Sequence, residues 1–537
     1  MSTIACTSSS IDRSPLRLLA LLALVLAACT AAPDQPFSSA FTTGSSAPAA
    51  SAGPLAADRI QILHTNDIHG RMEAETVRVG NNSFQKGGVA QLAGLTAQFR
   101  ARAPDRTLLL DAGDAWQGAF VSNENRGAAL VQVMDRMGYD AQALGNHDFD
   151  WGQDVLRARA GEATFPFLAA NVVDETTGLV VPFAKPYIVK DLRLARVAVI
   201  GIANPGTPAI NKPANVKGVR FLPAAETVRK YLPELRAQAD IVVAVTHIGK
   251  DDDVALARAV PDIDVIVGGH SHTAIQTAIL EGKTTIVQAG SYSEWLGHLE
   301  LTIDPQTHAV TAAARGSELA TIATGGAKPD AEVARIVADR AAAARSVTSR
   351  VVGKTLVALE PQSAGEFPLG DVIVDAMLDY CRAAGWGSDI ALHNNSGVRS
   401  SIPAGDITYG QVYEVLPFDN VVVSIDLAGA QLRKIFERTV SGRPGNLLVA
   451  GGSYAFRWSA DAGQRISSVT VSGAPLDPAR TYHVCTIDYL ALGGDDQTTF
   501  REGTHVIYGD LTAEVVSDYL TRHSPVSPKN EGRIVQQ

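Results

Sequence analysis

The segment IQILHTNDIHG, residues 60–70, decides the fold class of this chain. A short aliphatic run ends in Asn-Asp-x-His, which puts Asp67 and His69 just beyond a predicted buried strand. Six similar runs follow before residue 273, and helical patterns, such as those at 88–103 and 127–138, separate them. This alternation predicts an α/β layered fold, in which ligands collect on the loops beyond the strand ends.

Polar clusters stand at four later strand ends. The stretches GDAWQG, GNHDFDWG, VTHIG and GGHSHT supply, in chain order, Asp114, Asn146, His247, His270 and His272. Each cluster alone has an ordinary explanation, because an Asp can cap a helix, a buried His can be satisfied, and GHSH can form a turn. Five clusters in one order, each beyond a strand, instead indicate a shared metal site. Mixed Asp, Asn and His ligands favour Mn, Zn, Fe or Co over Ca.

Such a ligand set suits the hydrolysis of a phosphate ester. Two cations about 3.5–4 Å apart lower the pKa of a bound water that attacks phosphorus, and they neutralise charge on the phosphoryl oxygens. We therefore expect two divalent metal ions, with Mn, Zn or Co favoured and Mg as an alternative. A carboxylate such as Asp114 can bridge both ions.

The stretch GNHDFDWG also predicts a catalytic pair. Asn146 suits a metal as a neutral oxygen ligand, which leaves the neighbouring His147 to face the substrate. A histidine there can donate to the developing charge or to the leaving oxygen, and a carboxylate three residues on can favour its protonated form. The alternative is that Asp150 only caps the following helix. We expect His147 and Asp150 to act as a catalytic pair.

Composition narrows the class of protein. The chain has 537 residues, 46% hydrophobic and 19% charged, as in soluble globular proteins, and this length predicts two domains of roughly 200–250 residues. The net charge is −10 and no basic run stands out beyond the leader, so polymeric nucleic acid is not an expected partner. Sequence does not decide whether Cys381 and Cys485 pair.

The N-terminus carries a targeting pattern. Arg13 and Arg17 precede an apolar run at 18–28, which is shorter than the ~20 residues of a membrane span and ends in Leu-Ala-Ala-Cys. This pattern predicts a lipoprotein signal peptide over 1–28 with Cys29 lipidated, and an ordinary signal peptide is the alternative. We therefore expect an exported protein of the periplasm or cell envelope, anchored to the membrane by lipid.

Composition also divides the remaining chain. Residues 29–57, rich in Ser, Ala, Pro, Thr and Gly, predict a flexible tether. We expect a metal-binding domain over 58–325 and an Ala- and Arg-rich linker helix over 326–350. A smaller α/β domain is expected over 351–537.

The order of these motifs resembles a known family. NDIHG, GDxxxG, GNHDFDWG, THxG and GHSH are similar to the motifs of calcineurin-like metallophosphoesterases. The GNHDFDWG form and the C-terminal half resemble the 5′-nucleotidase family, which includes bacterial UDP-sugar hydrolases and animal ecto-nucleotidases. The resemblance covers residues 59–524. It implies an α/β fold with a four-layer β-sandwich flanked by helices, followed by a smaller α/β domain.

The resemblance also implies roles for individual residues. One metal would be held by Asp67, His69, Asp114 and His272, and the other by Asp114, Asn146, His247 and His270. Some relatives have Gln at the position of His272, a difference that changes metal preference more than mechanism. His147 and Asp150 match the catalytic His–Asp pair of the family.

The second half carries the residues expected to hold a substrate. Stacking on an aromatic ring contributes about 1–3 kcal/mol per nucleobase, and Phe418 and Tyr489 are the candidate rings, although ordinary packing is the commoner role of an aromatic residue. The resemblance implies base and phosphate contacts at Asn394 and Arg399 and a ribose contact at Asp495.

One departure from the family concerns phosphate recognition. The family usually has an Arg shortly before the L-G-[DN] sequence, whereas this chain has no Arg from Leu356 to Tyr380. An Arg side chain binds phosphate specifically through two parallel hydrogen bonds. Its absence therefore weakens the case for strict nucleoside-monophosphate specificity. Glu366 nearby is expected to repel an anionic ligand.

We therefore expect an exported two-metal phosphohydrolase that acts on nucleotides, as a 5′-nucleotidase or on UDP-sugars or dinucleotides. Alternatives are a 2′,3′-cyclic-nucleotide phosphodiesterase, a family esterase acting on a sulfur ester, and a non-catalytic nucleotide-binding lipoprotein. Because the substrate would touch both halves, we expect them to open and close about the linker helix. Sequence leaves the preferred leaving group and the oligomeric state open.

Overall fold

The structure, a computed structural model, describes residues 54–537 apart from 80–81, 314–317, 323–326 and 442–446. The predicted signal peptide, the lipidation site Cys29 and tether residues 30–53 lie outside the described residues. Within the described ranges, no helix has the length and apolar content needed to cross a membrane.

The N-terminal half contains two mixed sheets. The first has the strand order β16-β15-β1-β4-β5-β6, and β17 also pairs with β15. Its strands are β1 (Arg59–Thr65), β4 (Thr107–Asp111), β5 (Ala141–Ala143), β6 (Phe167–Leu168), β15 (Trp295–Ile303), β16 (Val310–Ala313) and β17 (Glu318–Thr321). Strands β1, β4, β5 and β6 are parallel, so their carboxyl ends meet at one edge.

The second sheet has the order β13-β14-β12-β11-β9-β8. Its strands are β8 (Tyr187–Leu192), β9 (Ala195–Ile202), β11 (Ile241–Thr246), β12 (Val265–Gly268), β13 (Ile279–Glu281) and β14 (Thr284–Val287). Apolar side chains of both sheets, including Ile62, Leu110, Val199 and Val243, form a shared buried cluster. Burial of both faces explains why these strands are continuous aliphatic runs.

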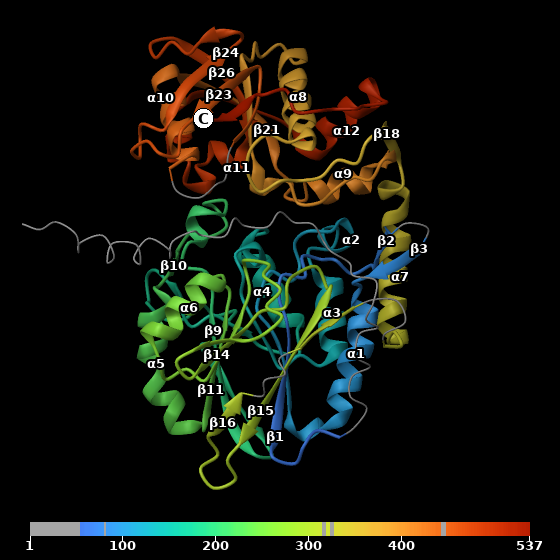
Figure 1. Cartoon of the computed structure of the whole chain (residues 1–537), viewed down its shortest axis with the longest axis vertical. Helices are drawn as coiled ribbons and strands as arrows, with labels where there is room; N and C mark the ends of the chain where they lie inside the picture. Colours follow the sequence, from blue (N-terminus) through green and yellow to red (C-terminus); the bar gives the residue numbers. More distant parts are fainter. Residues whose placement is uncertain (1–53, 80–81, 314–317, 323–326, 442–446) are drawn as a thin grey trace, which may run out of the picture. The chain divides into compact units, whose positions relative to one another are not determined.

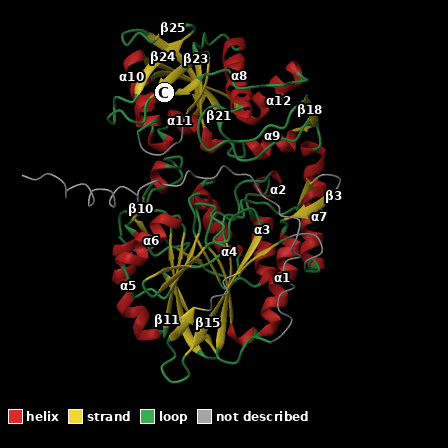
Figure 2. Cartoon of the chain, viewed as in Figure 1, coloured by secondary structure: helices red, strands yellow, loops and turns green. Residues whose placement is uncertain are grey.

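Helices cover the outer faces of the two sheets. Figure 1 shows α5 (Ala224–Gln238) and α6 (Lys250–Ala259) beside the second sheet, and α1 (Val89–Arg102) and α3 (Ala128–Met137) beside the first. Each pair of helices shares a hydrophobic cluster with its sheet. The order helix, sheet, sheet, helix is the predicted four-layer arrangement, and the fold class is confirmed (Figure 2).

The linker helix α7 (Ala331–Thr348) lies within the predicted segment 326–350. Asp330 begins the helix, because its side chain accepts the backbone N–H groups of Glu332 and Val333. The helix contacts α1 and α3 of the first half and α9 (Tyr409–Val415) of the second half. It therefore packs on both halves rather than bridging them through solvent.

The C-terminal half is a smaller α/β unit. Its main sheet has the order β22-β19-β26-β21-β27, and a second sheet has the order β25-β24-β23-β28. The main strands are β19 (Ile390–Asn394), β21 (Val421–Ala428), β22 (Leu447–Ala450), β26 (Thr481–Ile487) and β27 (Thr504–Leu511). The second sheet is built from β23 (Gly452–Phe456), β24 (Ile466–Val471), β25 (Ala474–Pro475) and β28 (Ile534–Gln536). The main helices are α8 (Pro368–Ala383), α10 (Gly429–Thr439) and α12 (Thr512–His523).

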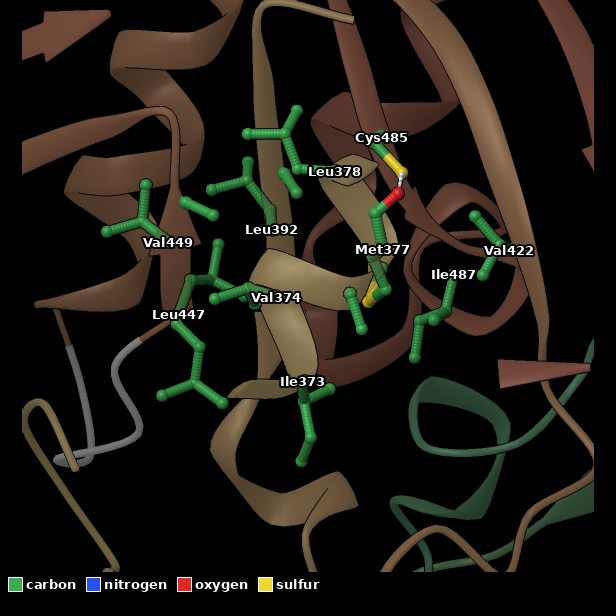
Figure 3. Packing of buried hydrophobic residues seen from close by; sticks show 14 of the residues in the cluster. Ile373, Val374, Met377, Leu378, Leu392, Val422, Leu447, Val449, Cys485 and Ile487 are labelled. Carbon is green, nitrogen blue, oxygen red and sulfur yellow. Dashed lines mark hydrogen bonds between the residues drawn. The ribbon is translucent and has the colours of Figure 1, made fainter. Parts of the chain in front are cut away.

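Helix α8 packs on the main sheet through a buried apolar face. Ile373, Val374 and Met377 of the helix face the core that contains Leu392 and Ile487 (Figure 3). A disulfide joins Cys381 of α8 to Cys485 of β26, which answers the pairing that sequence left open. The helix is therefore held to the sheet by packing and by a covalent bond.

Glu366 makes a structural contact that sequence did not predict. Its side chain is buried, and its carboxylate accepts the backbone N–H groups of Gly532 at 3.0 Å and Arg533 at 2.6 Å. The carboxylate holds the segment that leads into β28, and repulsion of an anionic ligand by Glu366 stays a prediction. This contact could not be predicted from local sequence patterns, because its partners lie more than 160 residues away along the chain.

Candidate active site

Strand ends bring the ligand candidates together. They follow β1, β4 and β5 of the first sheet and β11 and β12 of the second. The loops after β1 and β4 run side by side, because Asp67 N–H donates to Gly113 O at 2.9 Å and His69 N–H donates to Asp114 O at 3.0 Å. Both sheets therefore direct their polar residues to one place.

Two clusters of donor atoms result. Asp67, His69 and His272 form one, and Asp114, His247 and His270 form the other, each with its ligand atoms within 4.8 Å of one another. Oδ2 of Asp114 lies 2.9 Å from Nε2 of His247 and 3.9 Å from Nε2 of His69. One Asp114 oxygen therefore faces both clusters, as a bridging ligand would.

Hydrogen bonds outside the clusters fix two of the imidazole rings. Nδ1 of His69 lies 2.9 Å from Gln117 O, and Nδ1 of His247 lies 2.7 Å from Ala112 O. A carbonyl oxygen only accepts, so each Nδ1 carries a hydrogen, and Nε2 is the ring nitrogen left to bind a metal ion. This is the tautomer that a metal ion requires.

A third observation fits a bound cation. Oδ1 of Asn146 is buried and has no hydrogen-bond partner among the described residues. A buried carbonyl oxygen without a partner destabilises the fold by about 1–3 kcal/mol unless something else satisfies it. The chemistry of the donor set, which is carboxylate, imidazole and amide oxygen, suits a divalent ion.

The backbone at the site is also unusual. Five of the ligand candidates adopt the left-handed region, with φ of 51° at Asp67, 51° at His69, 55° at Asp114, 77° at His270 and 52° at His272. For residues with a Cβ this conformation costs about 1–2 kcal/mol each. Strain of this kind clusters at functional sites, because the side chains must point inward at that position.

His147 and Asp150 meet as predicted for a pair. Nδ1 of His147 lies 2.8 Å from Oδ2 of Asp150. Burial lowers the pKa of His147, but Asp150 and Asp114 outweigh burial and raise the pKa above its ordinary value, which favours the protonated ring. The His147 ring also stacks on Phe418, with ring centres 5.2 Å apart.

The substrate candidates fall into two groups. Arg399 lies at the metal clusters, with Nη2 3.5 Å from Nε2 of His69, and its guanidinium lies over Phe418 at 5.6 Å. Asn394 and Tyr489 instead hold Asp495, donating to its two carboxylate oxygens at 2.8 Å and 2.7 Å. The ribose candidate is therefore already hydrogen-bonded by its neighbours.

Sequence reasoning missed two residues of the quoted motifs that support the site. Asp148 is buried and accepts the backbone N–H groups of Asp114, Ala115 and Gly145, which ties two ligand loops together. Burial and the nearby Asp114 raise the pKa of Asp148 to about 7. Asn66 donates to Oδ2 of Asp67 at 2.7 Å. Both residues stand inside the quoted motifs, but a motif does not show which of its polar residues point into the ligand clusters.

Comparison with known families matches both halves. Residues 60–274 match the calcineurin-like phosphoesterase family, and residues 347–502 match the C-terminal domain of 5′-nucleotidases. The matched ranges contain all of the metal-ligand and substrate candidates named above.

Individual proteins resemble nearly the whole chain. Protein UshA of Yersinia enterocolitica is 30% identical, over 88% of this chain and 93% of that protein. A crystal structure of a 5′-nucleotidase precursor from Thermus thermophilus is 34% identical with a TM-score of 0.82, over 89% of this chain and 99% of that one. The trifunctional nucleotide phosphoesterase YfkN of Bacillus subtilis is 29% identical over 88% of this chain. The aligned region covers only 35% of the length of YfkN.

Proposed function

This chain belongs to the 5′-nucleotidase family of nucleotide phosphohydrolases, and from that premise we propose that it releases phosphate from nucleoside 5′-monophosphates at a two-metal centre. The observation that carries the proposal is Asp114, whose Oδ2 lies within 4 Å of His69 and His247 in separate ligand clusters. Asp67, His69, Asp114 and His272 would hold one ion, and Asp114, Asn146, His247 and His270 the other. Mn, Zn and Co suit these ligands, and Mg is the alternative.

The bound ions would lower the pKa of a water molecule and neutralise charge on the phosphoryl oxygens. The chain itself supplies the remaining electrostatic stabilisation. Arg399 would bind a phosphoryl oxygen, because its guanidinium lies at the edge of the His69 cluster. His147, protonated and held by Asp150, would donate a hydrogen bond from Nε2 to the charge that develops in the transition state.

The C-terminal half, which we call the substrate half, would hold the nucleoside. Phe418 and Tyr489 would stack on the base, and Asn394 and Asp495 would contact the base and the ribose. Stacking at Phe418 would place the nucleoside next to His147, since those two rings are in contact. The residues that bind the nucleoside and those that act on the phosphate would then share one substrate.

We also propose that the protein works outside the cytoplasm. The predicted signal peptide and the lipidation of Cys29 support export to the periplasm or cell envelope. The buried disulfide between Cys381 and Cys485 supports an oxidising compartment. A mass measurement of the mature N-terminus tests lipidation, because acyl chains on residue 29 add a defined mass.

A broader activity is a second candidate. The segment from Leu356 to Tyr380 has no Arg, and this absence favours a site that is less selective for monophosphates. UDP-sugars, dinucleotides and 2′,3′-cyclic nucleotides would then also be substrates.

One experiment tests both candidates. The protein is stripped of metal, reloaded separately with Mn, Zn, Co or Mg, and assayed for hydrolysis of AMP, UDP-glucose, NAD and 2′,3′-cyclic AMP. The products are separated by chromatography, because hydrolysis of the last three substrates does not itself release inorganic phosphate. We expect AMP to be the best substrate with at least one metal. Lack of turnover of AMP with all four metals would overturn the first proposal, and turnover of AMP alone would overturn the second.

A further inference from the structure

A loop without a recognised motif contacts both the catalytic pair and the substrate half. Residues 204–215 follow β9 and lead toward β10 (Val219–Phe221), with a short turn of helix η3 (Thr207–Ala209) inside them. We name residues 204–215 the coupling loop. No residue of this loop belongs to the predicted ligand set.

Asn211 of the coupling loop holds the catalytic pair. Its Nδ2 donates to Oδ1 of Asp150 at 2.8 Å and to the carbonyl oxygen of Asn146 at 2.9 Å. Since His147 occupies Oδ2 of Asp150, both oxygens of this carboxylate are engaged. Asn211 is 4% exposed, and Asn215 supports it by donating to its Oδ1 at 3.1 Å. The orientation of Asp150, and through it that of His147, therefore depends on Asn211.

The next residue along the chain reaches the substrate half. Nζ of Lys212 lies 2.8 Å from Oδ2 of Asp488, and the other oxygen of Asp488 accepts the backbone N–H of Tyr489 at 2.9 Å. The turn η3 also contacts the turn η5 (Gly494–Asp496), which contains the ribose candidate Asp495. Adjacent residues of one loop thus contact the catalytic pair on one side and the base-binding segment on the other.

We propose that Asn211 is a positioning residue. It couples the docking of the C-terminal half, through the pair of Lys212 with Asp488, to the orientation of His147. The inference rests on the proposed function, because it needs a substrate that engages both halves. When Asp488 pairs with Lys212, Asn211 is held against Asp150 and His147 points at the phosphoryl group. Hydrolysis of a small aryl phosphate, which contacts only the N-terminal half with its ligand clusters, does not depend on this link.

Variants at Lys212 test the link. Lys212→Met should lower kcat for AMP about tenfold, with a smaller change in KM, and leave kcat for p-nitrophenyl phosphate within about twofold. Lys212→Arg keeps the charge and should restore most of the AMP activity. Lys190→Met is the matched control, because Lys190 forms a Lys–Asp pair of similar length, 2.7 Å to Asp140, within the first half. Equal losses on both substrates, or no loss with AMP, would overturn the link.

Asn211→Ala tests the positioning role. It should lower kcat for both substrates by about tenfold or more, while bound metal, measured by atomic emission, and Tm stay close to wild type. In the Asn211→Ala background, Lys212→Met should cause no further loss, because both changes act through one contact. Additive losses in the double variant, or loss of metal in Asn211→Ala, would overturn the proposal.

Failure of this inference is distinguishable from failure of the proposed function. Wild-type protein that does not hydrolyse AMP contradicts the proposed function. Active wild-type protein whose Lys212→Met and Asn211→Ala variants behave like Lys190→Met contradicts the coupling alone.

Discussion

Asp114 is the residue on which the candidate site depends most. Its Oδ2 faces both ligand clusters, and its Oδ1 accepts the backbone N–H of His147 at 2.7 Å. The same carboxylate therefore contacts both candidate metal clusters and the start of the turn that carries His147 and Asp150. A left-handed backbone, with φ of 55°, points it inward.

Replacing Asp114 with Ala should abolish the activity. We expect kcat/KM for AMP to fall by roughly three orders of magnitude or more, because one side chain contributes to both ion sites. Metal content, measured after dialysis, should fall as well. Asp154→Ala is the control, since the Asp154 side chain is 97% exposed and pairs only with Arg157 in the described contacts. Wild-type activity in Asp114→Ala would contradict the site.

Phe418→Ala should weaken nucleotide binding selectively. Stacking of a base on an aromatic ring contributes about 1–3 kcal/mol, so KM for AMP should rise about tenfold. For p-nitrophenyl phosphate the rise should be small, because that substrate has no base. Comparable changes in KM for both substrates would contradict a stacking role and favour the contact of Phe418 with His147 as its main function.

The proximity of the strand-end ligand candidates was predictable because a β-strand has a fixed direction. Once β1, β4, β5, β11 and β12 are recognised as parallel aliphatic runs, the residues just after them must lie at one edge. Asn211 and Asp148 were not predictable in this way. Their roles depend on hydrogen bonds between loops. Periodicity and spacing in the sequence do not predict which loops contact each other.

Helix α8 shows an electrostatic arrangement at the scale of an element. Asp371 and Asp375 lie on one side of the helix, and Arg533 forms two hydrogen bonds to Asp375, at 2.7 Å and 2.9 Å. Burial raises the pKa of Asp371 to about 8; Arg533 opposes this shift and Glu366 adds to it. The contacts that hold the segment leading into β28 therefore include a carboxyl group with a raised pKa.

This pKa shift predicts a pH dependence of stability. The folded state holds the proton of Asp371 more tightly than the unfolded state, whose pKa is near the usual 3.8, so the contribution of Asp371 to the free energy of unfolding falls as pH rises from about 4 to about 8. Asp371→Asn removes this contribution. In thermal unfolding across this range, Tm of wild type should decline relative to Tm of Asp371→Asn. Parallel Tm curves would contradict the raised pKa.

The disulfide is the second feature of α8 that can be tested. It joins residues 104 apart, and removal of a native disulfide destabilises a domain by about 2–5 kcal/mol. The Cys381→Ala/Cys485→Ala variant should therefore unfold at a lower denaturant concentration than wild type, with AMP hydrolysis retained at low temperature. An unchanged midpoint would show that core packing alone holds α8 to β26.

At the scale of the whole molecule, the halves touch through polar groups and through Phe120, whose ring contacts those of Tyr409 and Tyr413. Gln117 donates to Pro417 O at 2.6 Å, Asn123 donates to the same oxygen at 2.9 Å, and Arg71 pairs with Glu414 at 2.7 Å. Polar contacts exchange readily with water, so the halves can separate at a modest cost in free energy. Sequence predicted the two layered halves from strand and helix patterns, but it did not predict these partners, which lie about 300 residues apart.

Linking the halves should therefore block repeated turnover. In a Cys6→Ser/Cys29→Ser background, Arg71→Cys and Glu414→Cys can be joined by a short bis-maleimide, since the native side chains are in contact. We expect kcat for AMP to fall about tenfold or more after linking, because substrate and product must pass between the halves, while p-nitrophenyl phosphate is affected less. The unlinked double variant, and a linked Asp154→Cys/Arg157→Cys pair within one helix, serve as controls. Full turnover of AMP by the linked protein would show that the halves need not separate.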